Sequence, residues 1–309
     1  MIIYTPNKAF GRDILHLGHS RTMRKLMYYT LGVGVVTAIL IAPIIHLEIS
    51  EELKMNPTVF SFLGIVLSIL LVFRTNSAYD RWWEGRKQWG ALVNNTRNLA
   101  ILVQTAFPKD DEQVRHFMAT RISNFCLALV EHLRNGVIME ELINLTDDDR
   151  HRYDQKDHVP NYIATGIQQK FHDAYKAHVI GPEDHRNTMQ VWRGFLDILG
   201  ACERIKKTPI PFSYAVHIRT FILAYTVLLP FALVATFQFW TVPLVMFIFY
   251  AFMGVQMMAE EIEDPFGTDC NDLPTSTIAH NIKNNVFEIL EDKHHVKTES
   301  TQRDYDKIH

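Results

Sequence analysis

Hydrophobic residues gather in three long stretches of the chain that contain no charged side chain, namely Leu26–Leu47, Met55–Phe73 and Thr220–Ala259. A helix needs about 20 apolar residues to cross the ~30 Å hydrocarbon core of a bilayer. The first two stretches are each long enough for one crossing, and the third is long enough for two. The pattern therefore predicts an all-α integral membrane protein with four transmembrane helices.

Lysine and arginine residues near the ends of these stretches predict the orientation, because cytoplasmic loops of membrane proteins are enriched in both. The first 25 residues carry five of them, whereas the loop between the first two stretches carries only Lys54. More basic residues follow the second stretch and precede the third. We expect both termini on the cytoplasmic side of a bacterial inner membrane, and a turn of the third stretch near Ala235–Gln238.

The polar sequence between the two pairs of spans repeats its apolar residues every three or four positions, which is typical of amphipathic helices. We expect three such helices in a large cytoplasmic bundle, with core residues that include Trp89, Phe125 and Trp192. The predicted organisation is a cytoplasmic segment (1–25), a membrane hairpin (26–80), a cytoplasmic helical region (81–210), a second membrane hairpin (211–260) and a cytoplasmic loop with a tail (261–309).

Two polar segments have more than one interpretation. Asp147–Val159 bears acids and histidines that could bind a metal, but it lacks the fixed spacing of metal ligands, so we expect a solvated loop. The charged tail Asp292–His309 has no apolar periodicity, and we expect it either to wrap a partner subunit or to be disordered.

The charge balance and the motifs exclude several classes of function. With 31 Lys and Arg against 34 Asp and Glu, the net charge of −3 provides no basic field for nucleic acid. The three cysteines are far apart and form no CxxC pair, which indicates neither a disulfide framework nor a zinc site. The chain lacks a Gly-rich phosphate loop, a nucleophile elbow and an HExxH motif, so we predict that it is not an enzyme.

The second apolar stretch has the features of a helix that lines a pore. Ile65, Ile69 and Phe73 are spaced four residues apart and share one helical face. Small residues that let neighbouring helices approach lie beside them: Ser61, Gly64 and Ser68. Several copies around one axis would stack the large side chains into apolar rings, which gate ions by dewetting. The alternative is an apolar face against lipid or another helix.

The sequence that leaves this stretch, FRTNSAYDRWWEGRKQWG at 73–90, resembles the bestrophin family of ion channels, particularly its bacterial members. The resemblance continues in LGACERIKKTPIPFSY (199–214) and EEIEDPFGTDCNDLP (260–274) and covers nearly the whole chain. It implies a homopentamer around one central pore. Animal members resemble calcium-activated anion channels, whereas studied bacterial relatives favour cations, so the resemblance leaves the permeant ion open.

Matching positions imply roles for residues in and after the second span. The bacterial neck motif falls on Ile65, Ile69 and Phe73. An alternative register of the neck uses Thr58, Phe62 and Val66. Three residues after the span also match the family motif and would either fix the helix to the cytoplasmic bundle or contact ions: Arg74, Asn76 and Tyr79.

The resemblance also implies a second constriction, the cytoplasmic aperture, where a cytoplasmic helix begins. In GPEDHRN, Pro182 would be the first helical residue and Glu183 the aperture residue, at a position where many relatives have an aliphatic side chain. Five carboxylates there would favour cations. An acid in a first turn equally suits the helix dipole on any surface helix.

The segment EDPFGTDCNDLP resembles the family's calcium clasp. Asp269 and Asp272 match the two positions that supply side-chain oxygens, but three non-acidic residues interrupt the family's acidic run. Because calcium needs six to eight oxygen ligands, the segment is either a weakened calcium site or a structural turn.

The loop between the first two spans carries Glu48, Glu51 and Glu52 against Lys54, and five copies would form an acidic outer mouth. We therefore predict a homopentameric bestrophin-type channel in the lipid bilayer that favours sodium or potassium. It would require no cofactor, with calcium as an optional ligand. The alternatives are a chloride channel of the same fold and a non-conducting membrane scaffold or regulator.

Overall fold

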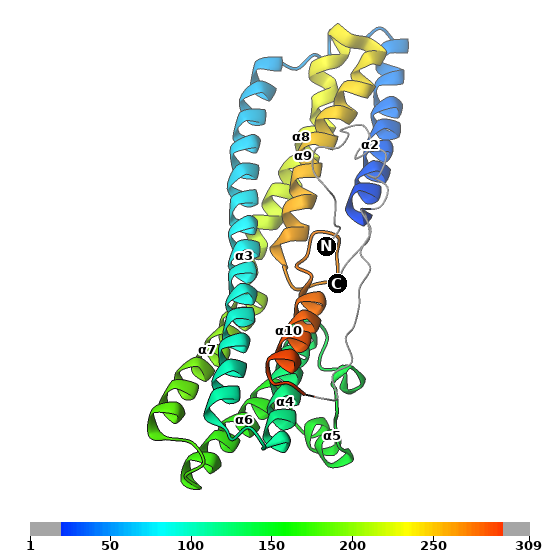
Figure 1. Cartoon of the computed structure of the whole chain (residues 1–309). Helices are drawn as coiled ribbons and strands as arrows, with labels where there is room; N and C mark the ends of the chain where they lie inside the picture. Colours follow the sequence, from blue (N-terminus) through cyan, green and yellow to red (C-terminus); the bar gives the residue numbers. More distant parts are fainter. Residues whose placement is uncertain (1–19, 293–309) are drawn as a thin grey trace, which may run out of the picture.

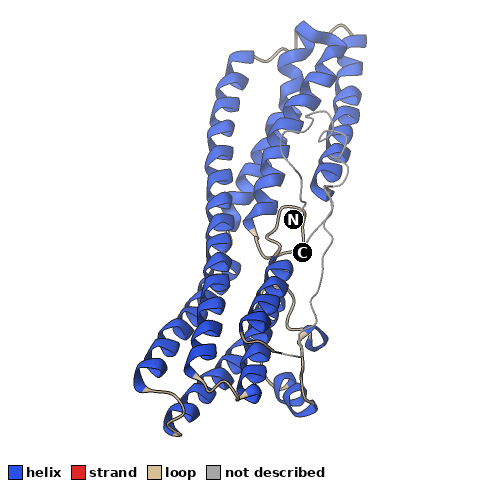
Figure 2. Cartoon of the chain, in the orientation of Figure 1, coloured by secondary structure: helices blue, strands red, loops and turns tan. Residues whose placement is uncertain are grey.

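The structure is a computed structural model that describes residues 20–292, so most of the expected N-terminal segment and the tail beyond Asp292 lie outside the described residues. Within this range the chain is helical and contains no β-strand, which confirms the all-α class for this part (Figure 2). The molecule is elongated, with long helices gathered at one end and a bundle of helices at the other (Figure 1).

Four helices form the apolar end: α2 (Arg21–His46), the first part of α3 (Pro57–Ala106), α8 (Phe212–Phe237) and α9 (Thr241–Glu263). Three segments are long and apolar enough to cross a membrane, and they correspond to α2, α3 and the α8–α9 pair. The pair turns back at a short 3-10 helix, η3 (Gln238–Trp240), so that α8 and α9 lie side by side (Figure 1). This turn begins at the end of the expected range.

Small residues allow α2 and α9 to pack closely. A Cβ atom on Gly34 of α2 would lie 2.5 Å from the sulfur of Met246, and a Cβ on Gly254 of α9 would lie 3.1 Å from Leu26. Since α3 also packs along α9, α9 lies between α2 and α3. Helices in a membrane associate through such close van der Waals contact, because lipid provides no hydrophobic driving force.

α3 is one uninterrupted helix that belongs to both ends of the molecule. The side chain of Asn56 accepts a hydrogen bond from the backbone N–H of Thr58, and Pro57 occupies the first turn, which together define its start. Its 50 residues extend to Ala106, a length of ~75 Å. The expected boundary after residue 80 falls within this helix, so the membrane part and the bundle share one rigid element.

The second half of α3 and five further helices form the bundle: α4 (Glu112–His132), α5 (Asp147–Asp154), α6 (Val159–Lys176), α7 (Pro182–Lys207) and α10 (Thr275–Ile289). Trp89, Phe125 and Trp192 are fully buried, as the periodicity predicted. The ring of Phe125 lies edge-on to Trp192 and Phe195, with centroid distances of 5.7 and 5.5 Å. Such contacts stabilise a core beyond the burial of area alone.

Two helices of the bundle differ from the sequence-based expectation. Asp147–Asp154 forms α5, so the prediction of a solvated loop was wrong for that part of the segment. The side chain of Thr146 caps α5, and three acidic residues in its first turn match the positive end of the helix dipole. Residues 275–289, assigned to a loop and tail, form α10, which packs against α3 and α4.

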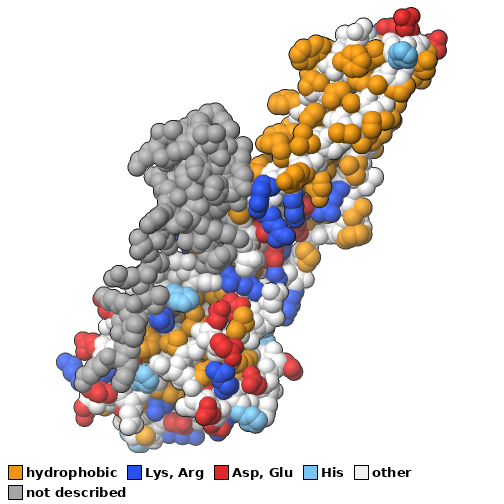
Figure 3. Space-filling view, turned by 90° about the vertical axis from the view of Figure 1, so that its right-hand side faces the viewer, with side chains coloured by type: hydrophobic (Ala, Val, Ile, Leu, Met, Phe, Trp, Pro, Cys, Tyr) orange, Lys and Arg blue, Asp and Glu red, His pale blue; other side chains and the backbone are white. Residues whose placement is uncertain are grey.

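The surface divides in the same way as the fold. Hydrophobic side chains cover the upper part of the visible face, and acidic and basic side chains are interspersed over the lower part (Figure 3). Lysine and arginine side chains gather where the hydrophobic part ends. This distribution is the one expected for a protein that is partly embedded in a bilayer.

Candidate functional site

The exposed face of α3 within the apolar end carries large hydrophobic side chains. Ile65, Ile69 and Phe73 are 58%, 51% and 62% exposed, whereas Leu67 and Leu71 on the opposite face are buried against α8 and α9. Phe62 and Val66 of the alternative register are exposed as well. The single chain therefore leaves both registers open, and the assignment of the neck to one of them stays a prediction.

The line of small residues beside this face has two different environments. Gly64 faces α8 of the same chain, since a Cβ there would lie 3.2 Å from the hydroxyl of Tyr225. Ser61 and Ser68 are exposed and donate hydrogen bonds to carbonyl groups of their own helix. Their hydroxyls are thus satisfied locally, and the small, exposed serines leave room for a neighbouring helix.

The acidic loop joins α2 to α3 at the end of the molecule remote from the bundle. Glu48, Glu51 and Glu52 are all exposed or partly exposed there, and Glu48 has a positive φ of 56°. Lys54 lies 3.1 Å from Glu51, which compensates one of the three charges.

Arg74 follows the apolar part of α3 directly and is almost completely buried, with 1% exposure. Its guanidinium contacts the carboxylate of Glu263 at the end of α9, at 2.5 Å. The other oxygen of Glu263 accepts the backbone N–H of Ile210, in the connection between α7 and α8. One ion pair therefore joins three parts of the chain where the apolar end meets the bundle.

The other two residues of the post-span motif lie on the surface. Asn76 is exposed, and Tyr79 is half exposed with its ring stacked near Trp82 and Trp83. Arg81, about two turns after Arg74 on α3, donates to the backbone carbonyls of Glu263 and Ile205. Arg81 thus joins α3 to α7 and α9, a contact that the motif comparison missed. The roles expected for Asn76 and Tyr79 stay predictions.

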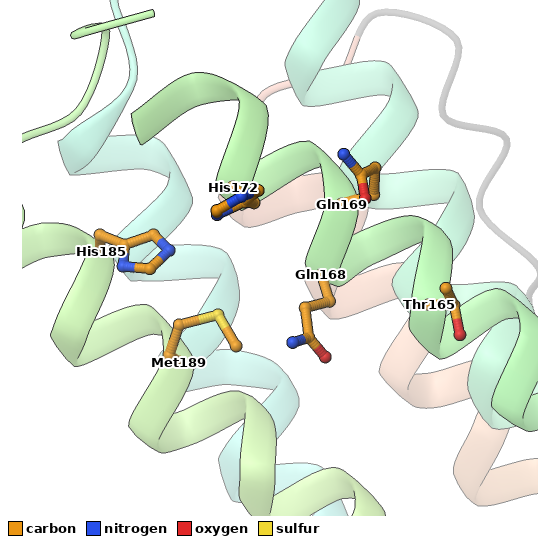
Figure 4. A pocket seen from close by; sticks show the side chains of 6 residues that line it. All are labelled: Thr165, Gln168, Gln169, His172, His185 and Met189. Carbon is orange, nitrogen blue, oxygen red and sulfur yellow. The ribbon is translucent and has the colours of Figure 1, made fainter. Parts of the chain in front are cut away.

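The expected aperture residue lies where the resemblance places it in the chain, in the first turn of α7. Pro182 is the first residue of this helix, and Glu183 is exposed and paired with Arg186 at 2.5 Å. A cavity of about 350 Å³ opens nearby between α6 and α7 (Figure 4). His172 of α6 and His185 of α7 lie across it from each other, with ring centroids 6.4 Å apart.

The segment after α9 collects acidic side chains around a buried turn. Asp272 is 3% exposed, and its Oδ2 accepts the backbone N–H of Asp269. Burial, together with the neighbouring carboxylates of Asp269, Asp264 and Glu261, raises the pKa of Asp272 to about 6. The second oxygen of Asp272 and one oxygen each of Asp264 and Glu261 are buried without a hydrogen-bond partner in the described chain. The other oxygen of Asp264 pairs with Lys206 at 2.6 Å, the one ion pair that these four carboxylates make in the described chain.

One further cluster of possible metal ligands was not anticipated from the sequence. Among the described residues, only His132, His158 and Glu203 bring three such atoms within 4.8 Å of one another. Both imidazole Nε2 atoms contact the same oxygen of Glu203, at 2.7 and 3.1 Å. His158 Nδ1 accepts the backbone N–H of Asn161 and caps α6, so its Nε2 carries the proton and donates to Glu203.

This tautomer opposes metal binding, since a metal-bound imidazole normally keeps its proton on the other nitrogen. The cluster is better explained as a structural hydrogen-bond contact that connects α4, the start of α6 and α7. Its residues are separated by 26 and 45 positions in the sequence, so no spacing rule could have found them.

Comparisons with known proteins agree on one family. The model of the Bacterial/Fungal Bestrophin protein family matches residues 3–288. A voltage-dependent anion channel-forming protein of Nostoc sp. is 35% identical over 73% of this chain and 75% of its own length. The voltage-dependent anion channel-forming protein YneE of Escherichia coli K12 is 32% identical over 80% of this chain and 84% of its own.

A solved structure has the same fold. The bacterial bestrophin homologue from Klebsiella pneumoniae, solved by Zn-SAD phasing, superposes with a TM-score of 0.80 at 26% identity. The match covers 86% of this chain and 98% of the Klebsiella chain. The similarity therefore includes both the apolar helices and the bundle.

The hydrogen bonds between Glu203 and the two histidines lead to a prediction about stability. Burial alone would raise the pKa of Glu203, but hydrogen bonds from His132 and His158 outweigh it and hold that pKa below its ordinary value. The contribution to stability is therefore present above about pH 4.5 and lost as the pH falls through the folded-state pKa. Glu203→Gln should lower the free energy of unfolding by about 1–3 kcal/mol at pH 7 and by less at pH 4, as measured by denaturant unfolding in detergent. The control Glu288→Gln, at an exposed position of α10, should change the free energy of unfolding little. A loss of stability in Glu203→Gln that does not depend on pH would contradict the charge-based explanation.

Proposed function

The chain belongs to the Bacterial/Fungal Bestrophin family, and on that premise we propose that five copies assemble around a central anion-conducting pore lined by α3. The named relatives and the bestrophin fold support an ion channel rather than an enzyme. The observation that carries the proposal is the exposed apolar face of α3 in a chain with these relatives.

The fold of one chain supports a pore that is shared between copies. α2 and α3 pack on different sides of α9, so no ring of helices closes around an axis within the chain. Ile65, Ile69 and Phe73 would line the neck once α3 helices from several copies face one another. Apolar rings of this kind pass ions only when wetted, and their radius and hydrophobicity set the barrier. The number five comes from the family resemblance.

Anions are favoured over the cations expected from the acidic loop. The relatives are named anion channel-forming proteins, and the exposed face of α3 from Pro57 to Phe73 bears no charge that would reject anions. The acidic positions are partly compensated, because Lys54 pairs with Glu51 and Arg186 pairs with Glu183. Exposed acids mainly change local ion concentration, and salt screens that effect within ~8 Å at physiological ionic strength.

The distribution of basic residues supports an inner-membrane location with both termini in the cytoplasm. Basic residues cluster at the start of α2 and after the apolar part of α3, at the bundle end of the membrane helices. The positive-inside rule assigns this end to the cytoplasm. The bundle and the aperture at Glu183 would then be cytoplasmic, and the acidic loop would face outward.

Calcium is the ion that the buried acidic turn would accept. Asp269 and Asp272 match the clasp positions, and the unpartnered oxygens of Asp272, Asp264 and Glu261 are hard donors of the kind that calcium prefers. Backbone carbonyls would supply the remaining ligands. A bound cation would neutralise the repulsion between these carboxylates and stiffen the connection between α9 and α10.

The shared pore is tested by the mass of the assembly. Native mass spectrometry of the detergent-purified full-length chain should give five copies of the 35.8 kDa subunit. The preparation should retain this mass over a range of protein concentrations. A population of monomers or of a stable dimer alone would exclude a pore between copies.

The permeant ion is tested by reconstitution into planar bilayers under a KCl gradient. The reversal potential should lie near the chloride equilibrium potential, because no fixed charge in the neck rejects anions. A triple variant in which Glu48, Glu51 and Glu52 are changed to Gln should shift it only slightly, and mainly at low salt. A wild-type value near the potassium equilibrium potential would refute anion selectivity while leaving the channel intact.

The neck register is tested by one pair of substitutions. Ile69→Ala should raise the conductance or the open probability severalfold, because it widens an apolar ring and lowers the dewetting barrier. Leu70→Ala is the matched control, since Leu70 is partly buried against the α8–α9 core. Single-channel recording compares both variants with the wild type. Equal effects would argue against the register of Ile65, Ile69 and Phe73.

The calcium proposal predicts a change in thermal stability. At a calcium concentration 100-fold above Kd, the native state should gain about 2.7 kcal/mol, whereas magnesium should have less effect. Asp272→Asn should abolish this gain without lowering the stability measured in chelator, because it removes a repelled carboxylate. The exposed Asp154→Asn control should respond to calcium like the wild type. An unchanged response in Asp272→Asn would exclude this site.

A further inference from the structure

A groove in the apolar end lies between α2 and α8, on the side of the molecule remote from α3. It has a volume of about 480 Å³ and is lined by residues of α2, α8 and α9 that include Tyr29, Gly32, Leu223 and Phe249. Because α9 separates α2 from α3, the groove is on the side of the chain opposite to the proposed pore-lining helix.

The groove exists partly because Gly32 has no side chain. A Cβ atom at this position would meet nothing within 4 Å, so open space lies beside the backbone of α2. The hydroxyl of Thr226 in the groove wall already donates to the carbonyl of Ile222. The groove, whose lining also includes Thr37, Tyr28 and Tyr29, thus offers mainly apolar contact.

The length and position of the groove match one leaflet of a membrane. The lining of α2 extends from Tyr28 to Leu40, 12 positions further along the helix, which is ~18 Å compared with ~15 Å for half of the hydrocarbon core. The tyrosine end lies toward the bundle, where α2 begins (Figure 1). Tyr28 and Tyr29 thus occupy the level at which aromatic side chains contact lipid headgroups.

Basic residues continue the stripe of the groove toward the bundle. Lys25 and Arg21 precede Tyr29 by four and eight residues and share its face of α2, and both are exposed. Arg219 of α8 is paired with Glu260, so Lys25 and Arg21 supply the positive charge that no acidic partner in the described chain compensates. Lysine and arginine side chains gather at this boundary in Figure 3.

We propose that the groove binds an acyl chain of an anionic phospholipid whose phosphate lies against Lys25 and Arg21. The apolar walls exclude a polar occupant, and the position of the basic residues selects a negatively charged headgroup. The site requires α2, α8 and α9 to be embedded in a bilayer, but it does not depend on ion conduction.

The test uses purified full-length protein supplied with phosphatidylglycerol or phosphatidylcholine and analysed for retained lipid by native mass spectrometry. The wild type should retain phosphatidylglycerol preferentially. Gly32→Phe should fill the groove without a backbone clash and lower retention at least severalfold. Ala38→Phe is the matched control, because Ala38 is exposed on α2 and does not line the groove.

A second pair of variants tests the headgroup contact. Lys25→Gln should reduce the preference for phosphatidylglycerol over phosphatidylcholine about fivefold, the effect of one basic residue at a membrane surface. Arg86→Gln, an exposed basic residue on α3 that does not line the groove, should leave it unchanged. Equal retention by wild type and Gly32→Phe would overturn the proposal. Disulfide-linked dimers of a Gly32→Cys variant in membranes would also overturn it, by identifying a second copy as the occupant.

Discussion

The ion pair between Arg74 and Glu263 is the constraint around which the molecule is arranged. It lies where the charge-free part of α3 ends, and the guanidinium is almost inaccessible to water. Removing one partner of a buried pair typically costs about 3–5 kcal/mol, because the other charge remains desolvated. The end of α9, the connection before α8 and the middle of α3 must therefore keep one mutual arrangement. That arrangement sets which face of α3 remains exposed.

Several acidic side chains outside the membrane helices have a nearby partner that compensates their charge. Glu183 is balanced by Arg186, Glu51 by Lys54 and Glu203 by two histidines. The acidic turn around Asp272 differs, because several carboxylates lie close together there and only Asp264 has a basic partner, Lys206. Strongly shifted groups with no compensating charge are candidates for ligand binding. The contrast distinguishes the turn from these paired acids, which the sequence alone could not separate from it.

The sequence predicted those features that depend on local pattern. Uncharged runs defined the membrane helices, and the spacing of Trp89, Phe125 and Trp192 predicted the core of the bundle. Pro182 also marked the start of α7. The sequence did not predict α5 and α10, because one is short and almost entirely polar and the other follows a turn with few apolar residues. The cluster at Glu203 depends on tertiary packing, which periodicity does not encode.

The continuity of α3 has a mechanical consequence. Arg74 divides the helix into arms of 17 and 32 residues, or ~25 and ~48 Å. If the buried pair is the pivot of a lever, a sideways displacement at Ala106 produces about half as much movement, in the opposite direction, at Pro57. Phe73 lies beside the pivot and hardly moves, whereas Ile65 lies well out along the short arm. Tilting would then change the diameter at Ile65 while that at Phe73 stays nearly constant, and only a rotation of α3 about its own axis would alter both.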